Sequence, residues 1–137
     1  MTEEKTQLSL PSRIDSIAEA AAAAAEVAKR VGLGEEGAFG LDMAVREAVT
    51  NAVLHGNRQD ESKQVGLVFA QEGHELVVTV TDEGTGFDPA GVADPTAAEN
   101  LLKTSGRGIL FMRNFMDTVE WQRHPEGGTV VRMTKKI

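Results

Sequence analysis

Apolar residues recur at steps of three and four between positions 35 and 56, which predicts an amphipathic helix. Its apolar face is expected to carry Leu41, Ala44, Val45, Ala48, Val49 and Ala52. Gly56 follows as a natural stop. Glu47 and Asn51 stand four residues apart and therefore lie one above the other on this helix. Taken alone, such a pair is read as two exposed polar side chains, because the spacing is common in helices.

A second helix is predicted to precede it, between Ser12 and about Arg30. Ser12, with Asp15 three residues later, matches an N-cap signature. The alanine run 20–25 has high helix propensity and allows close packing. The buried stripe expected on this helix is Ile14, Ile17, Ala18, Ala21, Ala25 and Ala28.

Short apolar or alternating runs predict the strands, with a hairpin turn at 71–74. The expected strands are 8–10, 65–69, 76–80, 119–123 and 129–133. A further helix is predicted over 109–116, and the long segment 88–104 is predicted to be a lid. Helices covering one face of such strands give an α/β (α+β) two-layer sandwich, with a mixed, mostly antiparallel sheet. Residues 1–137 are expected to form a single domain.

The amino-acid composition and the net charge limit the classes of function that the chain can have. The net charge of −7 disfavours direct nucleic-acid binding. The absence of Cys excludes disulfides and thiolate chemistry. No apolar run is long enough for a membrane span, and the polar N-terminus lacks the pattern of a signal peptide. A cytoplasmic protein is therefore expected.

Two glycine-rich stretches change the interpretation of Glu47 and Asn51. Asp82 is followed by Gly84 and Gly86 at the end of a predicted strand. These glycines allow the backbone to approach a flat ligand closely, and Asp82 can accept a hydrogen bond from an exocyclic amino group. Asn51 offers an oxygen suited to Mg²⁺, and Glu47 can take a proton from an attacking hydroxyl or water.

The second stretch, with Gly106 and Gly108, opens the predicted helix 109–116. Bare backbone N–H groups at a helix start favour a phosphate. Arg107 lies between these glycines and is the best basic phosphate contact. Lys103 in the predicted lid is read equally well as a phosphate contact or as a solvated lysine.

The segments Glu47-Ala-Val-Thr-Asn51, Asp82-Glu-Gly-Thr-Gly86 and Gly106-Arg-Gly-Ile109 resemble the N, G1 and G2 boxes of the GHKL ATPase superfamily, whose nucleotide fold is the Bergerat fold. Within that superfamily, the chain is most similar to the stand-alone anti-sigma factor serine/threonine protein kinases of bacteria. The similarity extends through the lid to Gly127-Gly-Thr129 and covers residues 9–133.

This resemblance implies a role for each matching residue. Glu47 matches the catalytic base, and Asn51 matches the Mg²⁺ ligand in an ATP site. Asp82 matches the acid that recognises adenine, supported by Gly84 and Gly86. The remaining matches are the phosphate-binding turn of Gly106, Arg107 and Gly108, and the strand residue Thr129 near the adenine.

The resemblance also implies partners. Members of this branch sequester a sigma factor, phosphorylate a serine of an anti-anti-sigma factor, and are commonly homodimers. Two other functions stay open. One is a separate histidine-kinase-type catalytic domain, whose acceptor histidine would have to come from another chain. The other is a nucleotide-binding regulator that grips its partner without phosphotransfer, although such a binder would not need Glu47.

Overall fold

The computed structural model describes residues 5–84, 115–123 and 127–137, and they form five strands and two α-helices followed by a π-helical segment. In chain order the elements are β1 (Lys5–Pro11), α1 (Asp15–Val31), α2 (Glu35–Asn51), η1 (Ala52–Gly56), β2 (Gln64–Glu72), β3 (Glu75–Thr81), β4 (Thr118–Arg123) and β5 (Thr129–Lys136).

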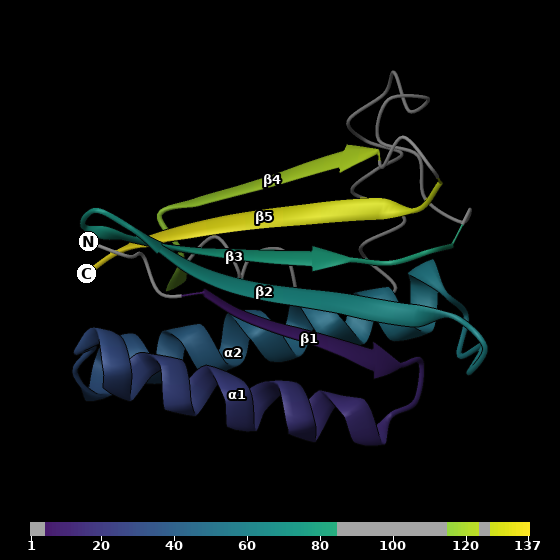
Figure 1. Cartoon of the computed structure of the whole chain (residues 1–137), viewed down its shortest axis with the longest axis horizontal. Coiled ribbons are helices and arrows are strands. Elements are labelled where there is room, and N and C mark those ends of the chain that lie inside the picture. The colour runs from purple at the N-terminus through teal and green to yellow at the C-terminus, as the bar shows by residue number, and fades with distance from the viewer. Residues whose placement is uncertain (1–4, 85–114, 124–126) are drawn as a thin grey trace.

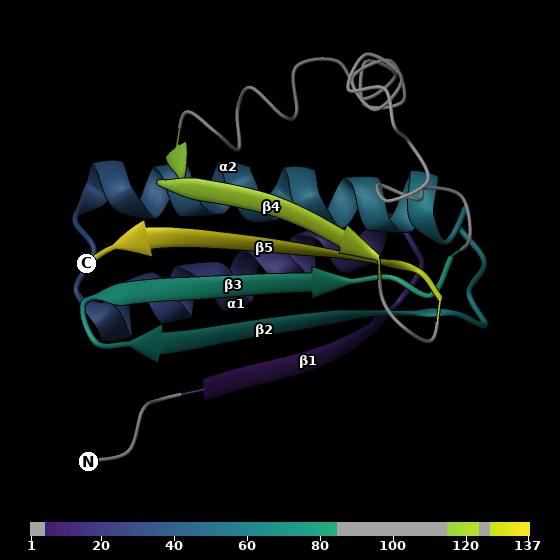
Figure 2. The same ribbon diagram turned by 90° about the horizontal axis from the view of Figure 1, so that it is seen from above.

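The strands form one sheet in the order β1-β2-β3-β5-β4, and each of its four pairings is antiparallel. Helices α1 and α2 lie side by side on one face of this sheet (Figures 1 and 2). The prediction of a two-layer α/β sandwich with helices on one face is confirmed. The hairpin between β2 and β3 is also as predicted, and Gly73 takes the left-handed conformation (φ 63°) in its turn.

The predicted apolar face of α2 is confirmed, because all six of its residues are buried. They belong to one core with the helix-facing side chains of the sheet, among them Leu67, Phe69, Val78 and Met133. Alternation along the strands explains this arrangement. In β2, Val65, Leu67 and Phe69 are buried, whereas the residues between them are only partly buried.

The predicted face of α1 is partly wrong. Ile14 is 52% exposed, and Ala18 and Ala25 are also exposed, whereas Ala21 and Ala28 are buried as predicted. The buried residues of α1 are Ser16, Ala20, Ala21, Ala24, Val27 and Ala28. A run of alanines offers no contrast between apolar and polar positions, so the pattern could not fix the rotation of this helix about its axis.

The predicted N-cap role of Ser12 is also wrong. The residue at the N-cap of α1 is Ile14, which makes no side-chain capping bond. The Ser12 hydroxyl instead donates to the Lys63 carbonyl oxygen at 2.7 Å. A local signature was therefore overridden by a contact between residues 51 positions apart.

The predicted lid 88–104 lies outside the described residues, as does nearly all of the predicted helix 109–116. Within the described ranges, neither helix has an apolar stretch long enough to cross a bilayer.

The corrected face of α1 can be tested with two neighbouring alanines. Ala24 is 1% exposed and Ala25 is exposed. We expect Ala24→Leu to lower the free energy of unfolding by about 1–3 kcal/mol, because the larger side chain overpacks the contact with the core. Ala25→Leu should change it by less than about 0.5 kcal/mol. Urea unfolding of both variants is the measurement, and equal effects would contradict this orientation of α1.

Candidate functional site

Asn51, the last residue of α2, has a buried side chain that is only 9% exposed. Neither its amide nitrogen nor its amide oxygen has a hydrogen-bond partner among the described residues. Buried polar groups in folded proteins are nearly always paired, and an unpaired one costs about 1–3 kcal/mol. An amide left in this state fits a residue whose partner is a ligand.

The helix does not end at Asn51 but widens into the π-helical segment η1. The Asn57 N–H donates to the Ala52 carbonyl oxygen, five residues earlier, at 2.8 Å. Such π segments are rare and occur frequently at functional sites. Here η1 connects Asn51 to Gly56, which lies against Asp82.

Asp82 directly follows β3 and is 6% exposed. One carboxylate oxygen, Oδ1, accepts the backbone N–H groups of Gly84 at 3.0 Å and of Thr129 at 3.1 Å. The Asp82 N–H in turn donates to the Thr129 carbonyl oxygen at 3.0 Å. Asp82 is therefore held at the point where β3 leaves the sheet and β5 begins.

Burial raises the pKa of the Asp82 carboxyl, and the hydrogen bonds from Gly84 and Thr129 oppose that rise. The second oxygen, Oδ2, lies against Gly56 and accepts no hydrogen bond from the described residues. Oδ2 is thus available to accept a hydrogen bond from a ligand. The exocyclic amino group predicted from the sequence would be such a donor.

Three glycines enclose Asp82. A Cβ on Gly56 would lie 2.2 Å from Asp82 Oδ2, and a Cβ on Gly128 would lie 2.0 Å from the Asp82 carbonyl oxygen. A Cβ on Gly84 would lie 1.5 Å from the Gly56 carbonyl oxygen. Gly128 also has a φ of 94°, which side chains rarely adopt. A side chain at Gly84 or Gly128 would require the backbone to shift, and one at Gly56 would displace the Asp82 side chain.

Sequence reasoning singled out Gly84 but interpreted Gly56 as a helix stop and Gly128 as a turn residue. The signal available for Gly128 was its place just before Thr129, which belongs to the predicted site. Nothing in the sequence indicated that Gly56 packs against Asp82, because the two residues come from different elements.

Glu47 lies on α2 one turn before Asn51 and is partly exposed. Partial burial raises the pKa of its carboxyl above the ordinary value. A carboxylate with a raised pKa is a stronger base, provided that it is ionised at the working pH. The described part of this site therefore combines a partly buried carboxyl group and an unpaired amide on one helix.

In the described segments, no group of three or more acidic or histidine side chains is arranged so that it could hold a metal ion. Mg²⁺ does not require one, since it commonly binds one or two protein oxygens together with substrate phosphates and water. The amide oxygen of Asn51 fits this role. The predicted residues Gly86, Lys103, Gly106, Arg107 and Gly108 lie outside the described residues, and their roles stay predictions.

Residues 10–135 match the family model of the histidine kinase-like ATPase domain. The chain belongs to this family. It is 38% identical over 95 residues to the anti-sigma F factor of Bacillus subtilis (strain 168), an alignment that covers 68% of this chain and 65% of that protein. It is 35% identical over 117 residues to the serine-protein kinase RsbW of the same organism, covering 81% and 72%. The resemblance to the anti-sigma factor kinase branch is thereby confirmed.

Solved structures agree on the fold. The structure of the RsbU and RsbW domains of Rv1364c from Mycobacterium tuberculosis has a TM-score of 0.67 at 20% identity, over 97% of this chain and 32% of that one. The SiaB–SiaC complex from Pseudomonas aeruginosa gives 0.62 at 15% identity, over 96% and 89%. At these identities the likeness concerns the fold alone.

The burial of Asp82 predicts a pH dependence of stability. Because the folded-state pKa is raised, the folded protein binds more protons than the unfolded chain between the two pKa values. The contribution of Asp82 to the free energy of unfolding should therefore fall as the pH rises from about 4 towards the raised pKa.

Asp82→Asn removes this titration but keeps an oxygen that can accept the two backbone N–H groups. We expect the difference in unfolding free energy between Asp82→Asn and the wild type to grow in favour of the variant over that pH range. Urea unfolding at a series of pH values measures it. A difference that does not change with pH would mean that burial does not perturb Asp82.

Proposed function

We propose that this protein binds Mg-ATP, sequesters a sigma factor, and phosphorylates a serine of an anti-anti-sigma partner. The names of its relatives, anti-sigma F factor and serine-protein kinase RsbW, support this assignment. The alignments span 65% and 72% of those two proteins. The family match and the geometry around Asn51 and Asp82 support the nucleotide site itself.

One observation carries the proposal: the buried amide of Asn51, which has no hydrogen-bond partner in the described segments, lies one helical turn from the partly buried carboxyl of Glu47. An unpaired amide suits a ligand of the metal or nucleotide, and a neighbouring base suits transfer to a hydroxyl. A nucleotide-binding protein that held its partner without phosphotransfer would not need Glu47 in this arrangement.

The chemistry assigned to each residue is as follows. Asn51 Oδ1 would hold Mg²⁺, which when bound would neutralise charge on the nucleotide phosphates. Asp82 Oδ2 would accept the exocyclic amino group of adenine. Glu47 would accept the proton of the partner's serine hydroxyl while the serine oxygen bonds to the γ-phosphorus and the bond to the β-phosphate oxygen breaks. The products are phosphoserine, ADP and a protonated Glu47, which releases its proton to water.

The homodimer and the cytoplasmic location expected from the resemblance remain part of this proposal. So does the phosphate contact assigned to Arg107. A regulator without phosphotransfer is the alternative, and the two functions differ in what Glu47 does.

Glu47→Gln tests the base. We expect the rate of serine phosphorylation at saturating Mg-ATP to fall at least about 100-fold, because general-base catalysis contributes about 10²–10⁴-fold. The affinity for Mg-ATP should stay within about threefold, since Glu47 is not placed in nucleotide binding. Radiolabelled phosphate transfer and calorimetry provide the two measurements, and a fully active variant would remove Glu47 from this role.

The wild-type rate should also depend on pH. Glu47 must be ionised to act as a base, and its pKa is raised above 4.5. The rate should therefore decline as the pH falls through that raised pKa, and the residual rate of Glu47→Gln should not follow this limb. Identical pH profiles for the two proteins would show that another group titrates.

Asn51→Ala tests the metal site. We expect it to weaken binding of ATP in the presence of Mg²⁺ at least about tenfold, because it removes the proposed protein ligand. It should be neutral or slightly stabilising in the absence of nucleotide, since the unpaired amide is no longer buried. Calorimetric titration and thermal unfolding measure the two effects. Unchanged affinity would place the metal elsewhere.

A further inference from the structure

Asn57, the residue that follows η1, forms side-chain hydrogen bonds to three separate parts of the chain. It is 1% exposed. Its Nδ2 donates to Ser12 Oγ at 2.7 Å and to the Gln64 carbonyl oxygen at 3.0 Å, and its Oδ1 accepts the Glu83 N–H at 2.8 Å. Asn57 therefore joins the segment before α1, the start of β2 and the segment after β3.

Glu83 is the residue through which this network reaches the candidate site. Its N–H is held by Asn57, and its carboxylate accepts the backbone N–H of Gln64. Ser12, the other anchor, is also 1% exposed, and its hydroxyl donates a hydrogen bond to the Lys63 carbonyl oxygen. The chain after β3 is thus fixed to the junction between the 57–63 loop and β2.

This anchoring acts on Asp82 from the side opposite to β5. The Thr129 carbonyl oxygen accepts the Asp82 N–H, and the Thr129 N–H donates to Asp82 Oδ1. The N–H of the next residue, Glu83, donates to Asn57 Oδ1. Gly84, whose N–H completes the hydrogen bonds to Oδ1, follows one residue later and packs on the backbone of Gly56 and Asn57. The peptide that carries Asp82 is therefore fixed at both ends.

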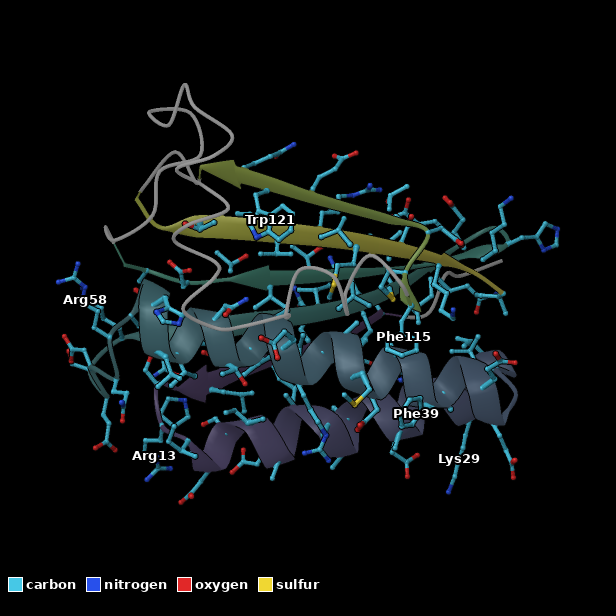
Figure 3. The ribbon with its side chains drawn as sticks, turned by 180° about the vertical axis from the view of Figure 1, so that it is seen from behind. Arg13, Lys29, Phe39, Arg58, Phe115 and Trp121 are labelled. Atoms are coloured by element: carbon cyan, nitrogen blue, oxygen red, sulfur yellow. The ribbon has the colours of Figure 1, made fainter. Side chains whose placement is uncertain are left out.

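We propose that Asn57 is a positioning residue for nucleotide recognition: without contacting the ligand, it sets the orientation of the Asp82 carboxylate and hence the affinity for adenine nucleotide. This inference rests on the proposed function. It also links the nucleotide site to the start of α1 through Ser12. Figure 3 shows this end of the molecule, where Arg13 and Arg58 flank Ser12 and Asn57 in the sequence, far from Phe39 and Lys29.

A buried, hydrogen-bonded asparagine also stabilises the fold, so the test must separate the two effects. Thr134 provides a matched control. It is 3% exposed, and its hydroxyl is paired with that of Thr118 at 2.5 Å. It lies on β5 five residues beyond Thr129, towards the opposite end of the sheet. Thr134→Val therefore removes a partly buried hydrogen bond far from Asp82.

The first measurement is calorimetric titration with Mg-ATP at a temperature where all proteins are folded. We expect Asn57→Ala to weaken binding at least about tenfold, and Thr134→Val to bind within about twofold of the wild type, even if both unfold at lower urea concentrations. Wild-type affinity in Asn57→Ala would overturn the inference. So would an equal loss of affinity in the two variants.

The second measurement needs no nucleotide. Amide hydrogen exchange of the free protein reports the N–H groups of Gly84 and Thr129, which Asp82 Oδ1 accepts. We expect both to exchange at least about tenfold faster in Asn57→Ala than in Thr134→Val. Unchanged exchange would overturn this inference alone. If the wild-type protein bound no Mg-ATP, the proposed function would be overturned. The proposed effect of Asn57 on nucleotide affinity would then be overturned as well.

Discussion

The structure around the candidate site depends on one buried carboxylate. Asp82 is almost fully enclosed, and within the described part of the chain its Oδ1 is satisfied by the backbone N–H groups of Gly84 and Thr129. Such a group is tolerated only where its bonds are accurately placed, since burying an unpaired charge is costly. The glycines at 56, 84 and 128 follow from this constraint, because a side chain at any of them would occupy the space of Asp82 or of the backbone that holds it.

A second constraint acts on the helix that faces the sheet. The apolar side of α2 is buried from Gly40 onwards, which fixes the rotation of the helix and so places Glu47 and Asn51. The change from α-helical to π-helical hydrogen bonding after Asn51 then brings Gly56 against Asp82. Core packing and carboxylate burial together set the geometry on which the proposed chemistry relies.

Periodicity was sufficient to predict the strands, the hairpin and the buried face of α2, because these elements have strong contrast between apolar and polar positions. It failed for α1, where alanines occupy both the buried and the exposed face. The motif residues Glu47, Asn51, Asp82 and Gly84 were singled out from residue type and spacing. Asn57 was not singled out, and Ser12 was interpreted only as an N-cap, since a polar residue in a loop gives no sign of burial until distant segments meet. Gly56 was missed as a site residue because its contact with Asp82 joins two elements that are distant in the sequence.

The central claim is that Asp82 Oδ2, which accepts no hydrogen bond from the described residues, accepts one from an adenine base. Adenine presents an exocyclic amino donor where guanine presents a carbonyl acceptor, and two acceptors facing each other repel. The most direct measurement is therefore calorimetric titration of the wild-type protein with Mg-ATP and with Mg-GTP under the same conditions. We predict that ATP binds at least about 100-fold more tightly, because a buried acceptor without a donor is strongly disfavoured. Equal affinities for the two nucleotides, or no binding of ATP, would contradict this role for Asp82.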